Sequence, residues 1–309
     1  MLVIYLELIF MIILWSFSFV VVDIAVEFIP PLSIALYRFI IASISFLIID
    51  IYFMINRKNK QDHEINHKHI KRSFSKNEWI LIIISSFTGV SLFFLAQYTA
   101  IEIIGPSLPA LFVCLITPVI ITILALIFFN EKLNALKIMG FIIATIGGFL
   151  LVTGGDITTL TPKSPNFLGY LFALITPLLW AIYSTATKKL SKTRSSNLMN
   201  KYIAYFGTFE LLIFVLFNGE IIIFIKNFLN VFLFISAVYL GFGCYVFGYF
   251  IWQNSQKKLK SSKVSSFLYI EPFLTLFFSL LLQRSEIIVL WNIFGGIVVI
   301  IAVLIINYK

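Results

Sequence analysis

Charged residues are scarce in this sequence. Only 12% of its 309 residues are Asp, Glu, Lys or Arg, whereas 60% are hydrophobic and the mean hydropathy is +1.01. A soluble domain carries about 25% charged residues, and no single core could hide so many Phe, Ile and Leu side chains from water. The shortage of charge therefore excludes a soluble globular domain and indicates that the chain lies in a lipid bilayer.

Residues that support disulfides, metal binding or catalysis are also few. The two cysteines, Cys114 and Cys244, fall in apolar stretches, where cysteine packs as a small hydrophobic residue. A solvated loop explains the three histidines better than a metal site does, since nothing fixes the geometry of His63, His67 and His69. We find no ATP-binding motif, no paired catalytic carboxylates, no zinc motif and no serine nucleophile elbow. The sequence therefore predicts no cofactor, no metal and no enzymatic activity.

Long apolar stretches are present instead, each near the roughly 20 residues that a helix needs to cross a bilayer. Alternating polar positions are absent, which argues against a β-barrel. The first stretch lacks a basic leader and a small-residue cleavage site, so we expect it to stay as a helix. We predict an all-α integral membrane protein with ten transmembrane helices, at Leu2–Val22, Leu32–Ile55, Trp79–Ile101, Pro106–Phe129, Ala135–Val152, Phe167–Thr187, Met199–Phe217, Phe228–Trp252, Val264–Leu282 and Ile287–Asn307.

The 23 Lys and Arg residues are distributed unevenly between the predicted loops. If the N-terminus is cytoplasmic, 19 of them lie on the inner side, Lys163, Lys226 and Arg284 lie outside, and Arg38 lies within a span. Because basic loops remain in the cytoplasm, we predict a multi-pass protein of the cytoplasmic membrane with both termini cytoplasmic. The net charge of +9 then reflects how the chain is oriented in the membrane, and we expect no nucleic-acid partner.

The second half of the chain resembles the first. Trp15 is matched by Trp180, 165 residues later, and Pro118 is matched by Pro272, 154 residues later. Each half then holds five spans, and an odd number of crossings forces the second half to enter the membrane upside down. We therefore predict two inverted five-helix repeats, residues 1–155 and 156–309.

Several motifs follow one another in a fixed order. The second span contains "LYRFIIA", the first half closes with "QYTAIEIIGPSLPALFVCLITPVIITILALIFFNEKL", and the second half contains "SSFLYIEP". In this order they resemble the EamA family of the drug/metabolite transporter superfamily, over nearly the whole chain. The resemblance implies ten helices, a central substrate cavity between the halves and alternating access. That family usually has glycine before the glutamate that ends helices four and nine, where this chain has Asn130 and Ser285.

Glu271 and Pro272 lie side by side deep in the ninth predicted span. A carboxylate at that depth should face protein or a water-filled cavity, and the proline removes a helix donor, so we expect a kink. Pro118 is the equivalent proline of the first half, and we interpret both prolines as scaffold. Thr117 stands at the position equivalent to Glu271. The glutamate either holds the kink as a polar contact or binds substrate or carries a proton, and the sequence leaves both roles open.

Arg38 is the only basic residue well inside a predicted span. It either anchors an anionic substrate group, pairs with a buried carboxylate such as Glu271, or joins two helices. The resembled family favours the structural role, because most members have an arginine here. Deep aromatic residues are expected to line a cavity or to pack between helices: Trp15, Tyr98, Trp180, Tyr183 and Tyr245. Those near span ends are expected to be interfacial anchors: Trp79, Trp252, Trp291 and Tyr308.

These features predict a secondary transporter that moves a small polar or amphipathic metabolite by alternating access. The resembled family's range includes amino acids, nucleoside-like compounds such as S-adenosylmethionine, and drugs. Without an ATP site, the energy comes from the substrate gradient or from coupled protons. The alternative is a membrane enzyme or lipid-handling protein that acts on a headgroup. Substrate identity, transport direction and oligomeric state do not follow from the sequence.

Overall fold

The described chain is helical. A computed structural model describes residues 2–58, 74–130, 134–153, 167–284 and 290–307. Within these ranges eight helical runs are long and apolar enough to cross a membrane, and two further apolar helices, α6 (Ala135–Thr153) and α14 (Leu290–Asn307), contain shorter apolar runs. The eight runs are Leu2–Ala25, Pro31–Tyr52, Lys76–Ile104, Ser107–Phe129, Phe167–Leu190, Ser196–Phe217, Val231–Lys258 and Ser261–Leu281. The chain is therefore an all-helical membrane protein, as the sequence predicts.

Five of the long runs are single α-helices, and three are composite. The single helices are α1 (Leu2–Ala25), α2 (Pro31–Lys58), α5 (Ser107–Phe129), α7 (Phe167–Leu190) and α8 (Ser196–Phe217). π-Helical segments join α3 (Lys76–Ser86) to α4 (Leu92–Ile104) through Phe87–Ser91, and α10 (Val231–Val238) to α11 (Phe250–Lys258) through Tyr239–Tyr249. A 3₁₀ turn, Ser266–Ile270, joins α12 (Ser261–Ser265) to α13 (Glu271–Leu281). The short helix α9 (Ile221–Asn227) was not predicted.

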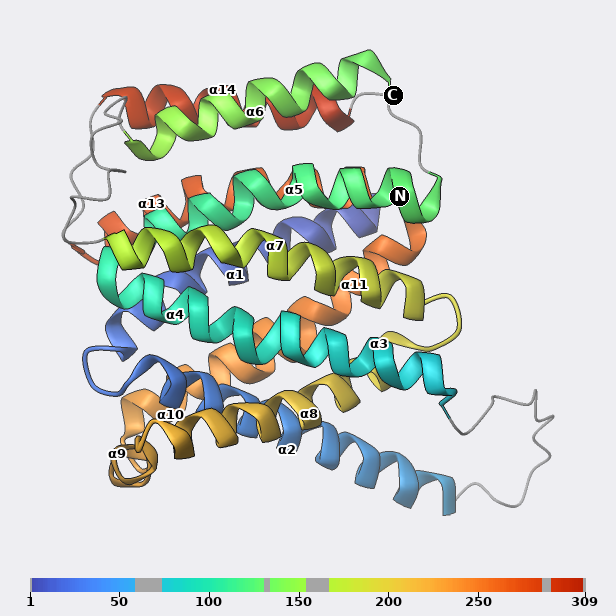
Figure 1. The fold of residues 1–309 in the computed structure, drawn as a ribbon, viewed down its shortest axis with the longest axis vertical. Coiled ribbons are helices and arrows are strands. Elements are labelled where there is room, and N and C mark those ends of the chain that lie inside the picture. Colours follow the sequence, from blue (N-terminus) through green and yellow to red (C-terminus); the bar gives the residue numbers. More distant parts are fainter. Residues whose placement is uncertain (1, 59–73, 131–133, 154–166, 285–289, 308–309) are drawn as a thin grey trace.

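The helices run side by side as a bundle (Figure 1). The start of α1 and the end of α14 lie at one end of the bundle, which we call the termini side, and α9 lies at the other end, the distal side. Helix α14 packs along α6, α5 packs against α7 and α13, α4 packs against α7, and α2 packs against α8. Segments far apart in the sequence thus form the centre of the bundle.

Pro272 lies in the middle of the helical run Ser261–Leu281. The run departs from α-helical geometry directly before it, since the 3₁₀ turn Ser266–Ile270 leads into α13, of which Pro272 is the second residue. Proline lacks the N–H donor that a regular α-helix needs at this place, so a local departure is expected there. Pro118, in contrast, lies inside α5, as predicted for a helix-interior proline. The two prolines therefore occupy different local structures.

The end of α5 explains one of the two missing glycines. Asn130 ends α5 with φ of 52°, and Gln283 adopts φ of 54° just after α13. This left-handed conformation closes a helix and favours glycine, but asparagine tolerates it too. Asn130 can therefore replace the glycine expected at the end of helix four. Ser285 lies outside the described residues, as do the histidines of the basic loop and the predicted boundary between residues 155 and 156.

An ion pair holds the beginning of α3 on the termini side. Ser75 and Glu78 form a reciprocal capping box, and Arg194, from the turn between α7 and α8, donates two hydrogen bonds to the Glu78 carboxylate. These bonds raise the pKa of the Arg194 guanidinium, which therefore stays charged. The contact fixes α3 against the α7–α8 turn.

Candidate functional site

One buried cavity lies in the middle of the bundle, between α1, α2, α4, α5, α7, the 239–249 segment and the start of α13. It holds about 50 Å³ of space accessible to water. Four of the predicted site residues line it, namely Trp15, Arg38, Trp180 and Glu271. The cavity therefore brings together the two opposite charges and two of the deep aromatic residues that the sequence singles out.

Arg38 is held by two other segments, α4 and the 239–249 segment. It lies on α2 with only 3% of its surface exposed. One terminal nitrogen donates to the Tyr98 hydroxyl on α4, and the other donates to the Leu240 carbonyl at 3.0 Å. The guanidinium carbon lies 4.2 Å from the centroid of the Phe94 ring, which is a cation–π contact. Gly241 allows this close packing, because a Cβ there would lie 2.3 Å from the Arg38 carbonyl oxygen.

Glu271 is the first residue of α13 and is equally buried, with 3% exposed. The Cys114 thiol of α5 donates to its Oε2 atom at 3.1 Å. The direct pair with Arg38 does not form, since no ion pair within 4.0 Å joins them in the described chain. Instead, the two charges face the same cavity separately.

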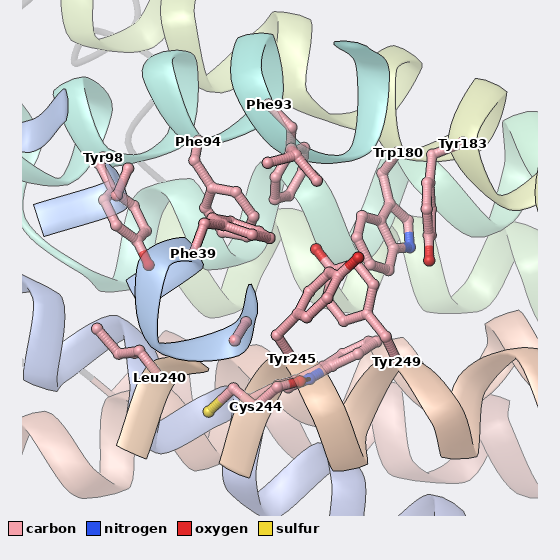
Figure 2. Close-up of a cluster of buried hydrophobic side chains, with 14 of the residues drawn as sticks. Phe39, Phe93, Phe94, Tyr98, Trp180, Tyr183, Leu240, Cys244, Tyr245 and Tyr249 are labelled. Atoms are coloured by element: carbon pink, nitrogen blue, oxygen red, sulfur yellow. Dashed lines mark hydrogen bonds between the residues drawn. The ribbon is translucent and has the colours of Figure 1, made fainter. Parts of the chain in front are cut away.

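Aromatic rings from three segments form one wall. Trp15 of α1 meets the Trp180 ring of α7 edge-on, with centroids 5.3 Å apart. Trp180 in turn meets Tyr249 of the π-helical segment at 5.2 Å. The Trp15 indole nitrogen donates to the Cys244 carbonyl at 3.0 Å, which fixes the orientation of its ring. Figure 2 shows Tyr249 rising from its segment toward Trp180 on the neighbouring helix. The wall is therefore rigid and largely apolar.

The three tyrosines predicted as lining residues lie behind the cavity surface instead. Each has at most 1% of its surface exposed, and its hydroxyl is bound to protein groups. Tyr98 accepts from Arg38, and Tyr183 accepts from Gln253 at 2.8 Å. Tyr245 donates to the Asn200 carbonyl at 3.0 Å. Figure 2 shows Tyr183 and Tyr245 beside the aromatic wall. These side chains hold the cavity residues in place.

The burial of Trp252 shows that its interpretation as an interfacial anchor is wrong. Its side chain is fully buried, and its indole nitrogen donates to the Ser184 hydroxyl at 3.2 Å. The reason is that α11 continues to Lys258, so Trp252 lies well inside the helix. Trp79 is half-buried and Trp291 is 55% exposed, while Tyr308 lies outside the described residues.

Sequence reasoning missed several lining residues. The polar ones are Ser18, Gln97, Cys114, Cys244 and Tyr249. Two of them left a signal in the sequence: Gln97 is an amide within an apolar span, and Tyr249 follows Tyr245 by one helical turn. The cysteines gave no signal, because cysteine inside a span is ordinarily a packing residue.

Glu210, a mid-span carboxylate without an evident partner in the sequence, lies outside the cavity lining. It accepts from the Ser86 hydroxyl at 2.7 Å and from the Ser91 hydroxyl at 2.6 Å. Ser86 directly precedes the π-helical segment Phe87–Ser91 and Ser91 ends it, so the carboxylate joins α8 to that segment. Hydroxyl partners of this kind leave no distinctive pattern in a sequence.

Comparison with known proteins identifies the family. The model of the EamA-like transporter family matches twice, over residues 2–153 and 167–308. An uncharacterized transporter of Archaeoglobus fulgidus is 22% identical over 86% of this chain and 84% of its own length. The uncharacterized transporter YyaM of Bacillus subtilis is 24% identical over 90% of this chain and 85% of its own length. A solved crystal structure superposes with a TM-score of 0.69 over 98% of this chain and 96% of its own, at 14% identity, which shows the fold alone. The chain belongs to the EamA-like transporter family.

Proposed function

We propose that the chain is a secondary transporter that moves a small polar or amphipathic metabolite through the central cavity by alternating access. The observation that carries the proposal is one buried cavity lined by Arg38 and Glu271, of opposite charge, within a bundle of membrane helices. Ionisable groups at membrane depth are costly and mark substrate or ion paths by default. Amino acids, nucleoside-like compounds and drugs are the candidate substrates, and protons are the candidate coupling ion.

The proposed architecture is ten transmembrane helices in two inverted repeats, residues 1–155 and 156–309. Counting the composite runs as single helices, the contacts of α2 with α8, α5 with α13 and α6 with α14 each join a helix to the fifth one after it. The packing of α5 on α7 is likewise matched by that of α13 on α1. Both the third and the eighth helix contain a π-helical segment. This pattern is what a two-fold relation between the halves requires.

We further propose that the termini side of the bundle faces the cytoplasm. Lys189, exposed at the end of α7, and Asn218, exposed after α8, lie at opposite ends of the bundle. Single cysteines at these positions, without Cys114 and Cys244, can be labelled in intact cells with an impermeant thiol reagent. Labelling of the cysteine at 218 but not at 189 is expected. The reverse result would overturn the orientation.

Flux measurements test the transport function against the alternative of lipid chemistry. The purified protein, reconstituted into liposomes, should carry at least one radiolabelled metabolite inward faster than empty liposomes do. A panel of amino acids, S-adenosylmethionine and cationic drugs covers the candidate classes. Turnover of a lipid headgroup without flux of any compound would support the alternative and reject transport.

A further inference from the structure

A second polar cluster lies outside the central cavity, between α8 and the π-helical segment Phe87–Ser91. At its centre is the Glu210 carboxylate, whose Oε1 atom accepts from Ser86 Oγ at 2.7 Å and whose Oε2 atom accepts from Ser91 Oγ at 2.6 Å. Distances this short are typical of hydroxyls that donate to an ionised carboxylate. The geometry therefore indicates a charged group on a membrane helix.

The charge of Glu210 has no counter-ion among the described residues, since no basic side chain there lies within 4.0 Å of its carboxylate. Glu210 lies seven residues before the end of α8 at Phe217, or roughly 10 Å along the helix axis. That depth places it within the hydrocarbon layer of a bilayer. A carboxylate there is costly unless a proton or a cation neutralises it.

The cluster has fewer hydrogen-bond donors than its oxygens can accept. Ser86 Oγ also lies 2.9 Å from the Ile83 carbonyl oxygen, and Ser91 Oγ lies 3.4 Å from the Phe87 carbonyl oxygen. Each serine has one hydroxyl hydrogen, so it can serve the carbonyl or the carboxylate but not both. Backbone N–H groups reach both carbonyls, yet each carbonyl keeps a second lone pair. A bound cation uses lone pairs of this kind.

Close packing holds these oxygens together. Gly207, one turn before Glu210 on α8, lies against the π-helical segment, because a Cβ there would lie 2.4 Å from Val90 Cγ1. Ser86 and Ser91 are fully buried, whereas Glu210 is only partly buried, so the cluster is reached past the carboxylate. Departures from the α-helix such as this π-helical segment are frequent at functional sites.

We propose that the oxygens of Glu210, Ser86 and Ser91 bind one sodium ion, with the Ile83 and Phe87 carbonyls as further ligands. Hard cations take oxygen ligands, and a monovalent ion neutralises the single carboxylate, whereas a divalent ion leaves an excess positive charge in the membrane. Oxygens 2.6–3.4 Å apart suit a small ion better than a large one, so potassium binds less well. The site lies apart from the central cavity, and the proposal does not rest on the proposed transport function.

Binding of radioactive sodium to the purified protein tests the site without any measurement of flux. Wild-type protein in choline chloride should bind the tracer saturably, at about one ion per chain, and unlabelled NaCl should displace it at lower concentration than KCl does. Saturating NaCl should also raise the midpoint of thermal unfolding by about 2–4 °C relative to choline chloride at the same concentration. Folded wild-type protein that binds no sodium saturably, or that KCl displaces equally well, overturns the proposal.

Variants locate the ion. Glu210→Gln keeps the size of the side chain but removes its charge and should abolish saturable binding, whereas Ser91→Ala removes one ligand and should weaken binding about tenfold. Ser85→Ala is the matched control, because Ser85 is a buried serine of the same run whose hydroxyl has no partner among the described residues, and sodium affinity should stay unchanged. Wild-type binding by Glu210→Gln, equal loss in the two serine variants, or loss in Glu271→Gln alone would place the ion elsewhere and overturn the proposal.

Discussion

The two halves of the chain carry different chemistry at equivalent positions. Under the proposed repeat, Arg38 of the first half corresponds to Ile203, and Glu271 of the second half corresponds to Thr117. The alignment of Asn130 with Ser285 likewise pairs Arg284, at the distal end of α13, with Phe129, at the end of α5 on the termini side. Under this proposal the halves share helix order and packing, whereas they do not share these charges. The backbone pattern therefore supplies the common framework, and the unshared charges distinguish the two sides of the cavity and the two ends of the bundle.

The two ends of the bundle show this difference most clearly. On the distal side, Arg284 donates to Asp23 and to Glu27 near the end of α1, both at 2.6 Å. On the termini side, the Lys188 and Lys192 ammonium groups lie 4.8 and 5.1 Å from the centroid of the Phe129 ring. These lysines occupy the repeat-equivalent positions of the two acids, 165 residues later.

Both contacts are weak, so the difference between their energies matters more than the energy of either one. The distal ion pair is partly exposed, with 52% of the Glu27 side chain accessible. A surface ion pair contributes about 0–1 kcal/mol, and an exposed cation–π contact about 0.5–1 kcal/mol. Two ends held by such similar energies would leave the two states close in free energy, so that both can be populated, as alternating access requires.

The largest expected effect is that of Arg38→Ala on folding. The substitution removes the tie between α2, α4 and the 239–249 segment and leaves buried acceptors without a donor. We expect a loss of about 3 kcal/mol in stability, measured as a lower midpoint of thermal unfolding in detergent and a lower yield of monodisperse protein. Ile203→Val, at the equivalent position of the other half, removes one methylene and should cost about 1 kcal/mol. Equal stability of the two variants would show that Arg38 is not a structural tie.

Glu271→Gln should instead affect transport and leave stability within about 1 kcal/mol of wild type, because glutamine retains a hydrogen-bonding oxygen. Proteoliposome uptake should fall roughly tenfold or more and lose its dependence on pH, since the titrating carboxylate is gone. The other titratable groups at the cavity are Arg38, Cys114, Cys244 and Tyr249. They remain in the variant.

The equivalent position of the first half supplies the control for Glu271. Thr117→Val removes a hydroxyl from α5 without touching a charge, and uptake should keep its pH dependence. Glu271→Leu, which also removes the polar contact with Cys114, should lower the unfolding midpoint as well as uptake. Wild-type uptake by Glu271→Gln, with unchanged pH dependence, would exclude a functional role for this carboxylate.

The smallest expected effect is at the ends of the bundle. Arg284→Gln breaks the distal ion pair and should favour opening on that side, by up to about fivefold for a contact near 1 kcal/mol. Cys114 and Cys244 line the cavity and report its accessibility, so their labelling by an impermeant thiol reagent added from the distal side should rise. Phe129→Leu removes the cation–π contact and should raise labelling from the termini side only. If both variants changed labelling from the same side, the comparison of the two ends would fail.

Hydropathy predicted the eight long helical runs closely, because the bilayer thickness fixes the length of an apolar helix. They also identified Arg38 and Glu271 as interior groups, since charges at that depth cannot face lipid. The rotation of each helix about its axis was not predictable, because packing against neighbouring helices decides it. For this reason Tyr183 and Tyr245 were expected at the cavity and lie behind it, and Trp252 was expected at an interface and is buried.

Local deviations from the α-helix were also beyond sequence reasoning. The π-helical segments Phe87–Ser91 and Tyr239–Tyr249 are apolar and contain glycine, like many regular membrane helices. The 3₁₀ turn before Pro272 depends on how α12 and α13 pack against α5. Such features follow from contacts between distant segments and leave no periodic pattern.

Uptake by reconstituted protein tests the central claim most directly. Liposomes containing wild-type protein, liposomes containing Glu271→Gln and empty liposomes are each given the same panel of radiolabelled metabolites, and initial rates are compared. The account predicts uptake of at least one of these compounds by the wild type, at roughly ten times or more the rate of the variant. Equal rates in wild-type and empty liposomes for every compound of the panel, from protein that is folded and correctly inserted, would contradict it.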